Sequence, residues 1–131
     1  MAMKDTRNHG ALRSHNADYK ITSGFLAAES AQSLFIELLE SIPWQPETVR
    51  MFGRRIESRR RGAFFGSIPL IYGYSGIRHQ SLPMPPVLGD LLTLVRQGTG
   101  VDFNSLLATL YPDGNTSLGW HQDDEPELGP R

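Results

Sequence analysis

The stretch SLLATLY, residues 105–111, followed at once by PDGN, residues 112–115, decides the fold. Successive side chains of a β-strand point to opposite faces, so Leu107, Thr109 and Tyr111 would share one face. Leu106, Ala108 and Leu110 would share the other face, and both faces are mostly apolar. This pattern is typical of a strand that is covered on both sides. Because PDGN is a strong turn signal, the strand is expected to end at Tyr111.

Two helices are predicted upstream of this strand. Apolar residues recur at helical spacing in residues 25–42 and again after Pro85-Pro86. Pro43 ends the first run because proline lacks an amide donor, and Gly98 and Gly100 close the second as a C-terminal cap. The apolar stripes comprise Leu34, Phe35, Leu38, Leu39 and Ile42 in the first helix, and Leu88, Leu91, Leu92 and Val95 in the second. We interpret both stripes as core packing rather than as ligand surfaces.

Two further strand segments are expected between the two helices. Residues 48–56 carry a glycine directly after Met51 and Phe52, which is typical of a hairpin tip. Residues 68–76 place Tyr72 and Tyr74 two apart, hence on one face if the segment is extended. Helices combined with several short strands predict an α+β fold with a β core.

Size and composition favour one globular domain. The chain has 131 residues, 39% of them hydrophobic and 21% charged, which is ordinary for a soluble protein. The absence of cysteine excludes disulfides and zinc–thiolate sites. No apolar run approaches the roughly 20 residues of a membrane span. We therefore expect a polar, flexible arm over residues 1–18, a domain over residues 19–131, and a soluble cytoplasmic location, with the oligomeric state left open.

Arginine is concentrated in one short segment. Six of the 13 basic residues fall within positions 50–61, beside the aromatic residues Phe52, Phe64 and Phe65. Guanidinium groups pair with phosphate in a fork and stack on flat groups, so the segment suits a nucleic-acid backbone. A solvated hairpin face is an equally good interpretation of the charge alone.

The final residues, GWHQDDEPELGPR (119–131), contain the pattern His121-x-Asp123. In an extended segment the two side chains point to the same side and supply two-thirds of the two-histidine, one-carboxylate triad of non-haem Fe(II). Taken alone, a surface histidine beside acidic residues is the commoner explanation. His79 is expected in a proline-flanked loop, and its spacing does not recommend it as a third ligand.

Residues 49–131 together resemble the AlkB family of Fe(II)- and 2-oxoglutarate-dependent dioxygenases, in the branch that repairs alkylated nucleic acids. The resemblance is carried by VRMFGR, IYGYSG, DFNSLLATLYPDG and GWHQDDEPELGPR, in the family's order. It implies N-terminal helices packed on a double-stranded β-helix, a jelly-roll-like core. It also implies Fe(II), 2-oxoglutarate and O2, with oxidative dealkylation of N-alkylated bases in DNA or RNA as the activity.

The resemblance also assigns roles to individual residues. His121 and Asp123 would be iron ligands. Tyr111, Thr109 and Leu107 would contact 2-oxoglutarate. The residues that would contact the nucleic acid are Phe52, Tyr72, Tyr74, Ser75, Glu125, Arg54 and Arg60. Phe52 would probe the base stack and the tyrosines would cover an extruded base, because chemistry on a paired base requires its extrusion. Ordinary packing of Phe52 and of the two tyrosines is the alternative.

The sequence departs from the family pattern in three places. Thr109 stands where the family usually has asparagine, and Phe64-Phe65 stands where Trp-Tyr is common. The chain also ends before the family's second histidine ligand and its two C-terminal arginines, so a C-terminally truncated domain with an incomplete β core and weak metal binding is expected. A catalytically inactive nucleic-acid-binding remnant and a non-functional gene fragment are therefore the alternatives to a complete enzyme.

Overall fold

The computed structural model of this chain describes residues 21–51, 53–74 and 77–119. In these residues two helices and six strands follow the order α1 (Ala28–Ser41), β1 (Gln45–Met51), β2 (Arg54–Gly66), β3 (Ile71–Tyr74), β4 (Ile77–Gln80), β5 (Leu82–Pro83), α2 (Pro86–Thr99) and β6 (Ser105–Leu110). The predicted α+β class is confirmed. The chain divides into two compact units, Met1–Glu40 and Ser41–Arg131. The domain boundary expected between residues 18 and 19 lies outside the described residues.

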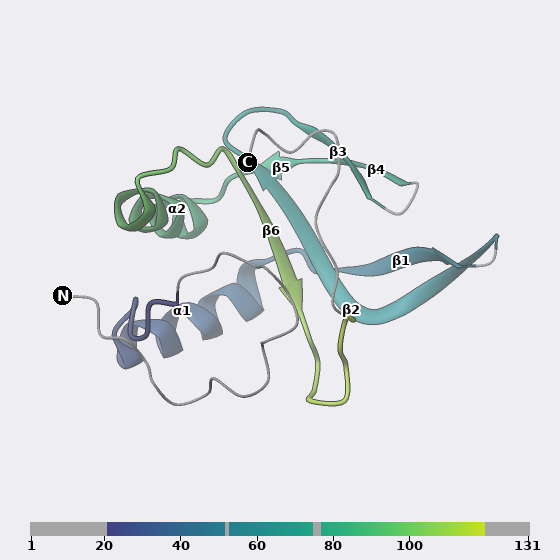
Figure 1. The fold of residues 1–131 in the computed structure, drawn as a ribbon, viewed down its shortest axis with the longest axis horizontal. Helices are drawn as coiled ribbons and strands as arrows, with labels where there is room; N and C mark the ends of the chain where they lie inside the picture. The colour runs from purple at the N-terminus through teal and green to yellow at the C-terminus, as the bar shows by residue number, and fades with distance from the viewer. Residues whose placement is uncertain (1–20, 52, 75–76, 120–131) are drawn as a thin grey trace. The chain divides into compact units, whose positions relative to one another are not determined.

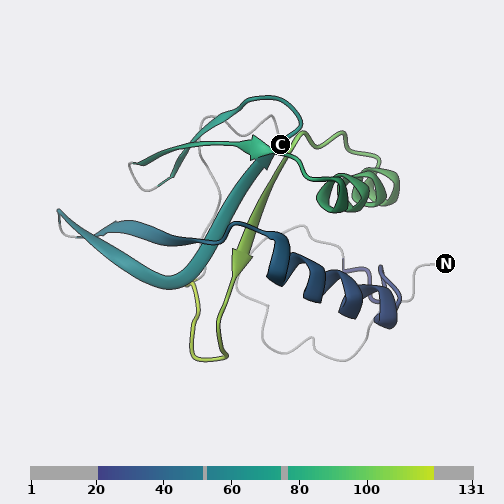
Figure 2. The same ribbon diagram turned by 180° about the vertical axis from the view of Figure 1, so that it is seen from behind.

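Strand β2 organises the larger sheet. It pairs antiparallel with β1 along its first part, parallel with the short β5 at its end, and antiparallel with β6. Figure 1 shows β2 as the long central strand with β6 beside it, and Figure 2 shows the same arrangement from behind. The predicted strand at 105–111 is thus confirmed to within one residue, and it pairs with residues 61–66 of β2.

The predicted hairpin tip is also confirmed. Met51 and Arg54 are the last paired residues of β1 and β2, and Gly53 adopts a φ of 74°. That left-handed conformation suits glycine, because the Cβ atom of any other residue would crowd its own backbone there. The register shifts between Pro46 and Thr48, so the β1–β2 ribbon contains a bulge below its tip.

Strands β3 and β4 form a second, two-stranded antiparallel sheet. Tyr72 lies directly opposite His79, and Ile71 lies opposite Gln80. The prediction that His79 lies in a proline-flanked loop is therefore wrong. The next proline is Pro83, three residues after the end of β4 at Gln80, so no proline within residues 77–80 prevents an extended backbone.

Helix α1 follows the predicted apolar stripe and stops one residue before Ile42-Pro43. It begins without a polar cap in the described contacts and carries Glu29 in its first turn, where a negative charge complements the helix dipole. None of its residues is buried, and Phe35, Ile36 and Leu39 are exposed. Of the predicted stripe, only Ile42, which directly follows the helix, belongs to the buried apolar core of the described residues.

Helix α2 matches its prediction at both ends. Pro86 occupies the first turn, where a missing amide costs nothing, and Gly100 caps the end by donating its N–H to the Arg96 carbonyl. Leu88 and Leu92 are buried on one side of the helix. Together with Ile42, Ala63 and Phe65 they make up the buried apolar core of the described residues. No helix in this part of the chain is long and apolar enough to cross a membrane.

Strand β6 differs from its prediction in exposure. A strand covered on both sides was expected, but its residues are half-buried and Leu107 is 55% exposed. The apolar character of one face has a different reason, which is that this face lines a cavity.

Candidate functional site

The pairing of β2 with β6 determines which side chains share a face. Gly62 is paired with Thr109 and Phe64 with Leu107, so these four residues lie on one side of the sheet. Ala63 and Phe65 point to the other side, where they are buried. The predicted alternation of SLLATLY is thereby confirmed, with Leu107, Thr109 and Tyr111 on the side that faces a cavity.

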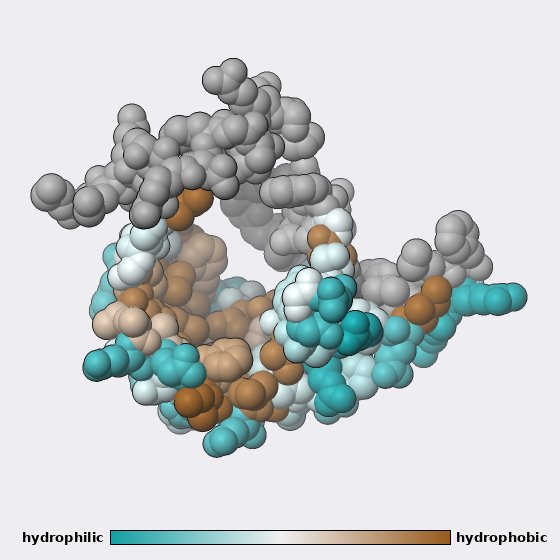
Figure 3. Space-filling model, turned by 90° about the horizontal axis from the view of Figure 1, so that it is seen from below, coloured by the Kyte–Doolittle hydropathy of each residue, from teal (hydrophilic) through white to brown (hydrophobic). Residues whose placement is uncertain are grey.

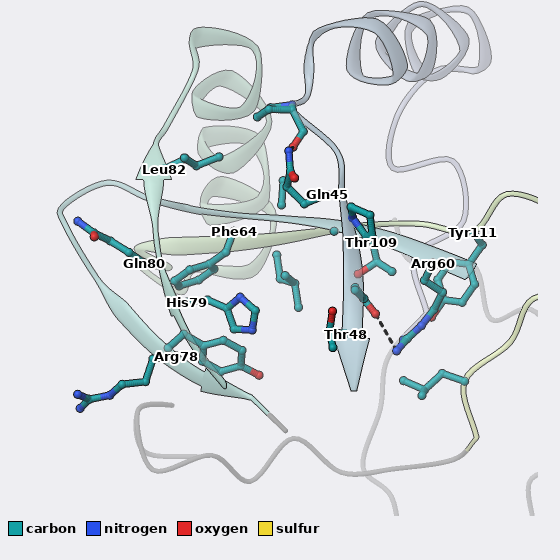
Figure 4. Close-up of a pocket in the computed structure, with 18 residues that line it drawn as sticks. Gln45, Thr48, Arg60, Phe64, Arg78, His79, Gln80, Leu82, Thr109 and Tyr111 are labelled. Carbon is teal, nitrogen blue, oxygen red and sulfur yellow. Dashed lines mark hydrogen bonds and ion pairs between the residues drawn. The ribbon is translucent and has the colours of Figure 1, made fainter. Parts of the chain in front are cut away.

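The cavity has a volume of about 560 Å³ and is formed within residues 41–131 (Figure 4). Its walls come from all six described strands and the segments next to them. The lining residues used below are Glu47, Arg60, Gly62, Phe64, Tyr72, His79, Leu107, Thr109 and Tyr111. The strands thus bring together residues from Pro43 to Leu118.

A buried ion pair occupies the polar side of the cavity. Arg60 Nη2 lies 2.7 Å from Glu47 Oε2, and the two side chains are only 7% and 17% exposed. No aligned hydrogen bond reaches Glu47 Oε2 from the described residues, so the contact is an ion pair without ideal donor geometry. Ser58 accepts hydrogen bonds from the amide and the Nε of Arg60 at 3.1 and 3.4 Å, which fixes the arginine at the bulge.

Gly62 makes room for this ion pair. A Cβ atom at position 62 would lie 3.0 Å from Glu47 Oε1 and 3.4 Å from Glu47 Cγ. The shorter distance is tighter than ordinary van der Waals contact, so a side chain at position 62 would require the Glu47 carboxylate to shift by a few tenths of an ångström. Gly62 therefore leaves the Glu47 carboxylate in its place without crowding.

The hydroxyl groups of Thr109 on β6 and of Tyr111 directly after it lie next to this pair. Tyr111 stacks beside Arg60, with 5.9 Å between the guanidinium carbon and the ring centroid. Figure 4 shows Thr109 and Tyr111 on the Arg60 side of the cavity. Two hydroxyl donors and one guanidinium therefore face the same space, which is a chemistry suited to carboxylate oxygens.

The other side of the cavity is aromatic. The rings of Phe64 and Tyr72 are 5.4 Å apart and tilted by 40°, a favourable geometry for two aromatic rings. His79 stands opposite Tyr72 on the neighbouring strand and also lines the cavity. A flat ligand could therefore stack at this end while polar groups hold its other parts at the far end.

The arginines of the hairpin differ in their exposure and in their partners. Arg54, Arg55 and Arg61 are exposed, and the projecting β1–β2 ribbon has a mostly hydrophilic surface (Figure 3). Arg60 differs from the expectation that it grips phosphate from the surface, because it is buried and paired with Glu47. Arg59 is bound to Asp113 at 2.5 Å although it is mostly exposed.

The turn after β6 is held by Asp113. Its carboxylate accepts hydrogen bonds from the hydroxyl of Thr116 and the amide of Asn115, both at 3.0 Å, and also binds Arg59. The hydrogen bond from Thr116 is the largest influence, and with Arg59 and Asn115 it lowers the pKa of Asp113 below its ordinary value of 3.8. The turn that leads towards residues 119–131 is thus anchored to β2.

Several predicted site residues cannot be located. Phe52, Ser75, His121, Asp123 and Glu125 lie outside the described residues, as does the side chain of Tyr74. Within residues 21–51, 53–74 and 77–119, no group of three histidine or acidic side chains could hold a metal ion. Of the predicted site residues that are described, Leu107, Thr109, Tyr111, Tyr72 and Arg60 come together in the cavity, whereas Arg54 lies near the hairpin tip.

Sequence reasoning missed two residues of the cavity, Glu47 and His79. Counting back from the hairpin tip at Gly53 would have put Glu47 opposite Ser58, and it is the register shift between Pro46 and Thr48 that brings it to Arg60. This bulge had no signal in the sequence. His79 could have been found from its place opposite Tyr72 in a hairpin centred on residues 75 and 76.

The comparison with known proteins now defines the class of protein. Residues 18–131 match the model of the 2OG-Fe(II) oxygenase superfamily, and the chain belongs to that family. Within it the chain is similar to alpha-ketoglutarate-dependent dioxygenase alkB homolog 3 of Bos taurus, with 37% identity over 107 residues. It is also similar to DNA oxidative demethylase ALKBH2 of Homo sapiens, with 34% identity over 122 residues, and of Arabidopsis thaliana, with 32% over 120 residues.

The matches cover most of this chain but a smaller part of the relatives. They span 81%, 91% and 88% of the chain, and 37%, 46% and 38% of the respective relatives. The chain thus spans less than half the length of these curated relatives. The expected membership of the AlkB-like branch of 2-oxoglutarate oxygenases is confirmed.

Proposed function

We propose that this chain contributes the substrate- and cosubstrate-binding part of an Fe(II)- and 2-oxoglutarate-dependent dioxygenase that removes alkyl groups from nucleic-acid bases. The observation that carries the proposal is the cavity, whose polar end holds Thr109 and Tyr111 and whose other end holds the aromatic pair Phe64 and Tyr72. The names of the relatives, an alpha-ketoglutarate-dependent dioxygenase and a DNA oxidative demethylase, point to the same chemistry.

The polar end fits a 2-oxoglutarate carboxylate. The hydroxyls of Thr109 and Tyr111 can donate hydrogen bonds to it, and Leu107 offers apolar contact to the carbon chain. Arg60 adds positive charge beside Tyr111, although Glu47 neutralises much of it. Threonine is shorter than asparagine, so the hydroxyl of Thr109 would lie closer to the strand backbone than the amide of an asparagine would.

Iron would be held by His121 and Asp123, both supplied by the segment that follows the turn anchored by Asp113. When bound, iron and 2-oxoglutarate would supply the oxidising chemistry by which O2 hydroxylates an N-linked alkyl group, which then leaves as an aldehyde. The residues of this chain would bind the base, orient its alkyl group and exclude water from the site.

The aromatic end fits a flat base. Phe64 and Tyr72 can stack on a base of any sequence, because every base has a π face. Outside the cavity, the exposed Arg54, Arg55 and Arg61 can bind phosphates and position the strand without reading its sequence. DNA or RNA that carries an alkylated base is therefore the proposed partner, with Phe52, Tyr74, Ser75 and Glu125 as further contacts.

The β core is proposed to be part of a double-stranded β-helix. The family match supports this architecture, and so does a sheet in which β6 pairs with the end of β2. In a jelly roll the ligand cavity lies between two facing sheets, and here the residues of β3 and β4 line the same cavity as those of β2 and β6.

A turnover assay tests the proposal. The purified protein is incubated with Fe(II), 2-oxoglutarate, O2 and a short single-stranded oligothymidylate that contains one 1-methyladenine. We expect loss of the methyl group with equal amounts of formaldehyde and succinate. The His121→Ala variant and the same oligonucleotide without the methyl group serve as controls, and neither should release formaldehyde.

Two results would count against an enzyme. If the protein binds the methylated oligonucleotide tightly but releases no more formaldehyde than His121→Ala, it is a nucleic-acid-binding protein without this activity. If it binds neither oligonucleotide at low salt, where phosphate contacts are strongest, the nucleic-acid partner is wrong as well.

A further inference from the structure

His79 has a defined orientation towards the cavity. It lies on β4 directly opposite Tyr72, and paired residues on adjacent antiparallel strands project to the same side of the sheet. Both residues line the cavity. In Figure 4 the imidazole of His79 lies beside Phe64 and points into the cavity, whereas the guanidinium of Arg78 points away.

The stacking surfaces at the aromatic end of the cavity do not read a base edge. Phe64 has no polar atom, and stacking on Phe64 and Tyr72 does not distinguish one base from another. Recognition of a base needs hydrogen bonds at its edge. The imidazole of His79 supplies one donor and one acceptor in the plane of its ring, at the end of the cavity where the stack lies.

Of the other charged groups of the cavity, Arg78 points its guanidinium away and the remaining two are paired with each other. Glu47 and Arg60 face each other on the polar side, 2.7 Å apart. Thr109 on β6 and Tyr111 directly after it lie on the Arg60 side of the cavity. Among the described residues, His79 is therefore the ring-nitrogen group placed beside the aromatic pair.

We propose that His79 is a specificity-determining residue, whose imidazole hydrogen-bonds the edge of an alkylated base stacked against Phe64 and Tyr72. The inference rests on the proposed function, because it assumes that the aromatic end receives a base. It adds a contact on β4 to the residues that carry the family resemblance. It also gives the aromatic end of the cavity a polar group beside Phe64, which has none.

Binding without iron or turnover tests this role. The probes are a short fluorescent oligothymidylate with one 1-methyladenine and the same strand with an abasic site at that position. Affinity is measured by fluorescence anisotropy for the wild type, His79→Leu, His79→Gln and Gln97→Leu. The last variant removes a polar side chain from the exposed surface of α2 and is the matched control.

The contact predicts a selective loss. His79→Leu should weaken binding of the methylated strand about tenfold, the equivalent of one hydrogen bond to a base edge, and leave binding of the abasic strand unchanged. His79→Gln should recover part of the loss, because an amide can also accept and donate. Gln97→Leu should bind both strands as the wild type does. Unchanged affinity for the abasic strand also verifies that each variant is folded.

The outcomes separate this inference from the function on which it rests. If the wild type prefers the methylated strand over the abasic strand and His79→Leu keeps the whole preference, the role of His79 is refuted and the base cavity stands. If the wild type has no preference, the cavity does not receive the base, and both proposals fail. A loss that is equal for both strands refutes the role of His79, because it would indicate damage to phosphate binding.

Discussion

The ion pair between Glu47 and Arg60 should respond strongly to the loss of one partner. Replacing Glu47 by alanine leaves the guanidinium of Arg60 in a place where its side chain is only 7% exposed. Ser58 contacts its Nε and Tyr111 stacks beside it, but neither carries a compensating negative charge. We therefore expect Glu47→Ala to be among the most destabilising substitutions on the cavity wall.

The structure also sets the size of the effect. Breaking a buried pair by removing one partner costs about 3–5 kcal/mol, because the remaining buried charge loses its counter-ion. The adjacent cavity would admit water to the guanidinium, and the contact lacks ideal hydrogen-bond geometry, so we place the loss at the lower end, about 3 kcal/mol. That corresponds to roughly a hundredfold change in the folding equilibrium.

Urea unfolding at neutral pH, followed by tryptophan fluorescence, measures this loss. Glu57→Ala is the matched control, because Glu57 lies on the same ribbon and is exposed, and its removal should change the unfolding free energy by less than about 0.5 kcal/mol. The double variant Glu47→Leu with Arg60→Met removes both charges and should regain most of the stability. A loss for Glu47→Ala no larger than that of Glu57→Ala would refute the assignment of a buried, energetically important pair.

Two further predictions concern the surroundings of the cavity. Gly62→Ala should cost about 1–3 kcal/mol in the same urea experiment, because the new Cβ would crowd the Glu47 carboxylate, and this cost should vanish in a Glu47→Ala background. For Asp113, a lowered pKa in the folded state means that its stabilisation is fully present above the ordinary value of 3.8 and is lost as pH falls through the lower folded value. Asp113→Asn should therefore be less stable than the wild type at neutral pH, with the difference shrinking below about pH 4 in thermal melts, and a difference that stays constant with pH would contradict it.

Local signals in the sequence predicted the elements that depend on local chemistry. Proline and glycine fixed the ends of α2, and the glycine at position 53 located the hairpin tip. The alternation in residues 105–111 correctly separated the side chains that line the cavity from those that do not. These signals succeed because a missing amide, a left-handed φ and a period of two act within a few residues.

Features that depend on distant partners were missed. The burial of Arg60 requires Glu47, a bulge and the space left by Gly62, and no single one of these determines it. His79 was assigned to a loop because β4 has only four residues and its pairing with β3 supplies most of its order. Short strands carry little periodicity of their own, so their existence depends on the sheet that they join.

The arginine segment illustrates how the fold divides one compositional signal. On β2 the residues at positions 60, 62 and 64 face the cavity, as their common place in its lining demonstrates. Neighbouring positions point the other way, and before the core residue Ala63 that side is open to solvent, so Arg61 is exposed. A cluster that looks uniform in sequence thus places one guanidinium beside Tyr111 and others on the outer surface. The proposed phosphate binding by the outer arginines and the proposed ligand binding in the cavity should therefore respond to different substitutions, because Arg61 points away from the cavity and Arg54 and Arg55 lie near the hairpin tip.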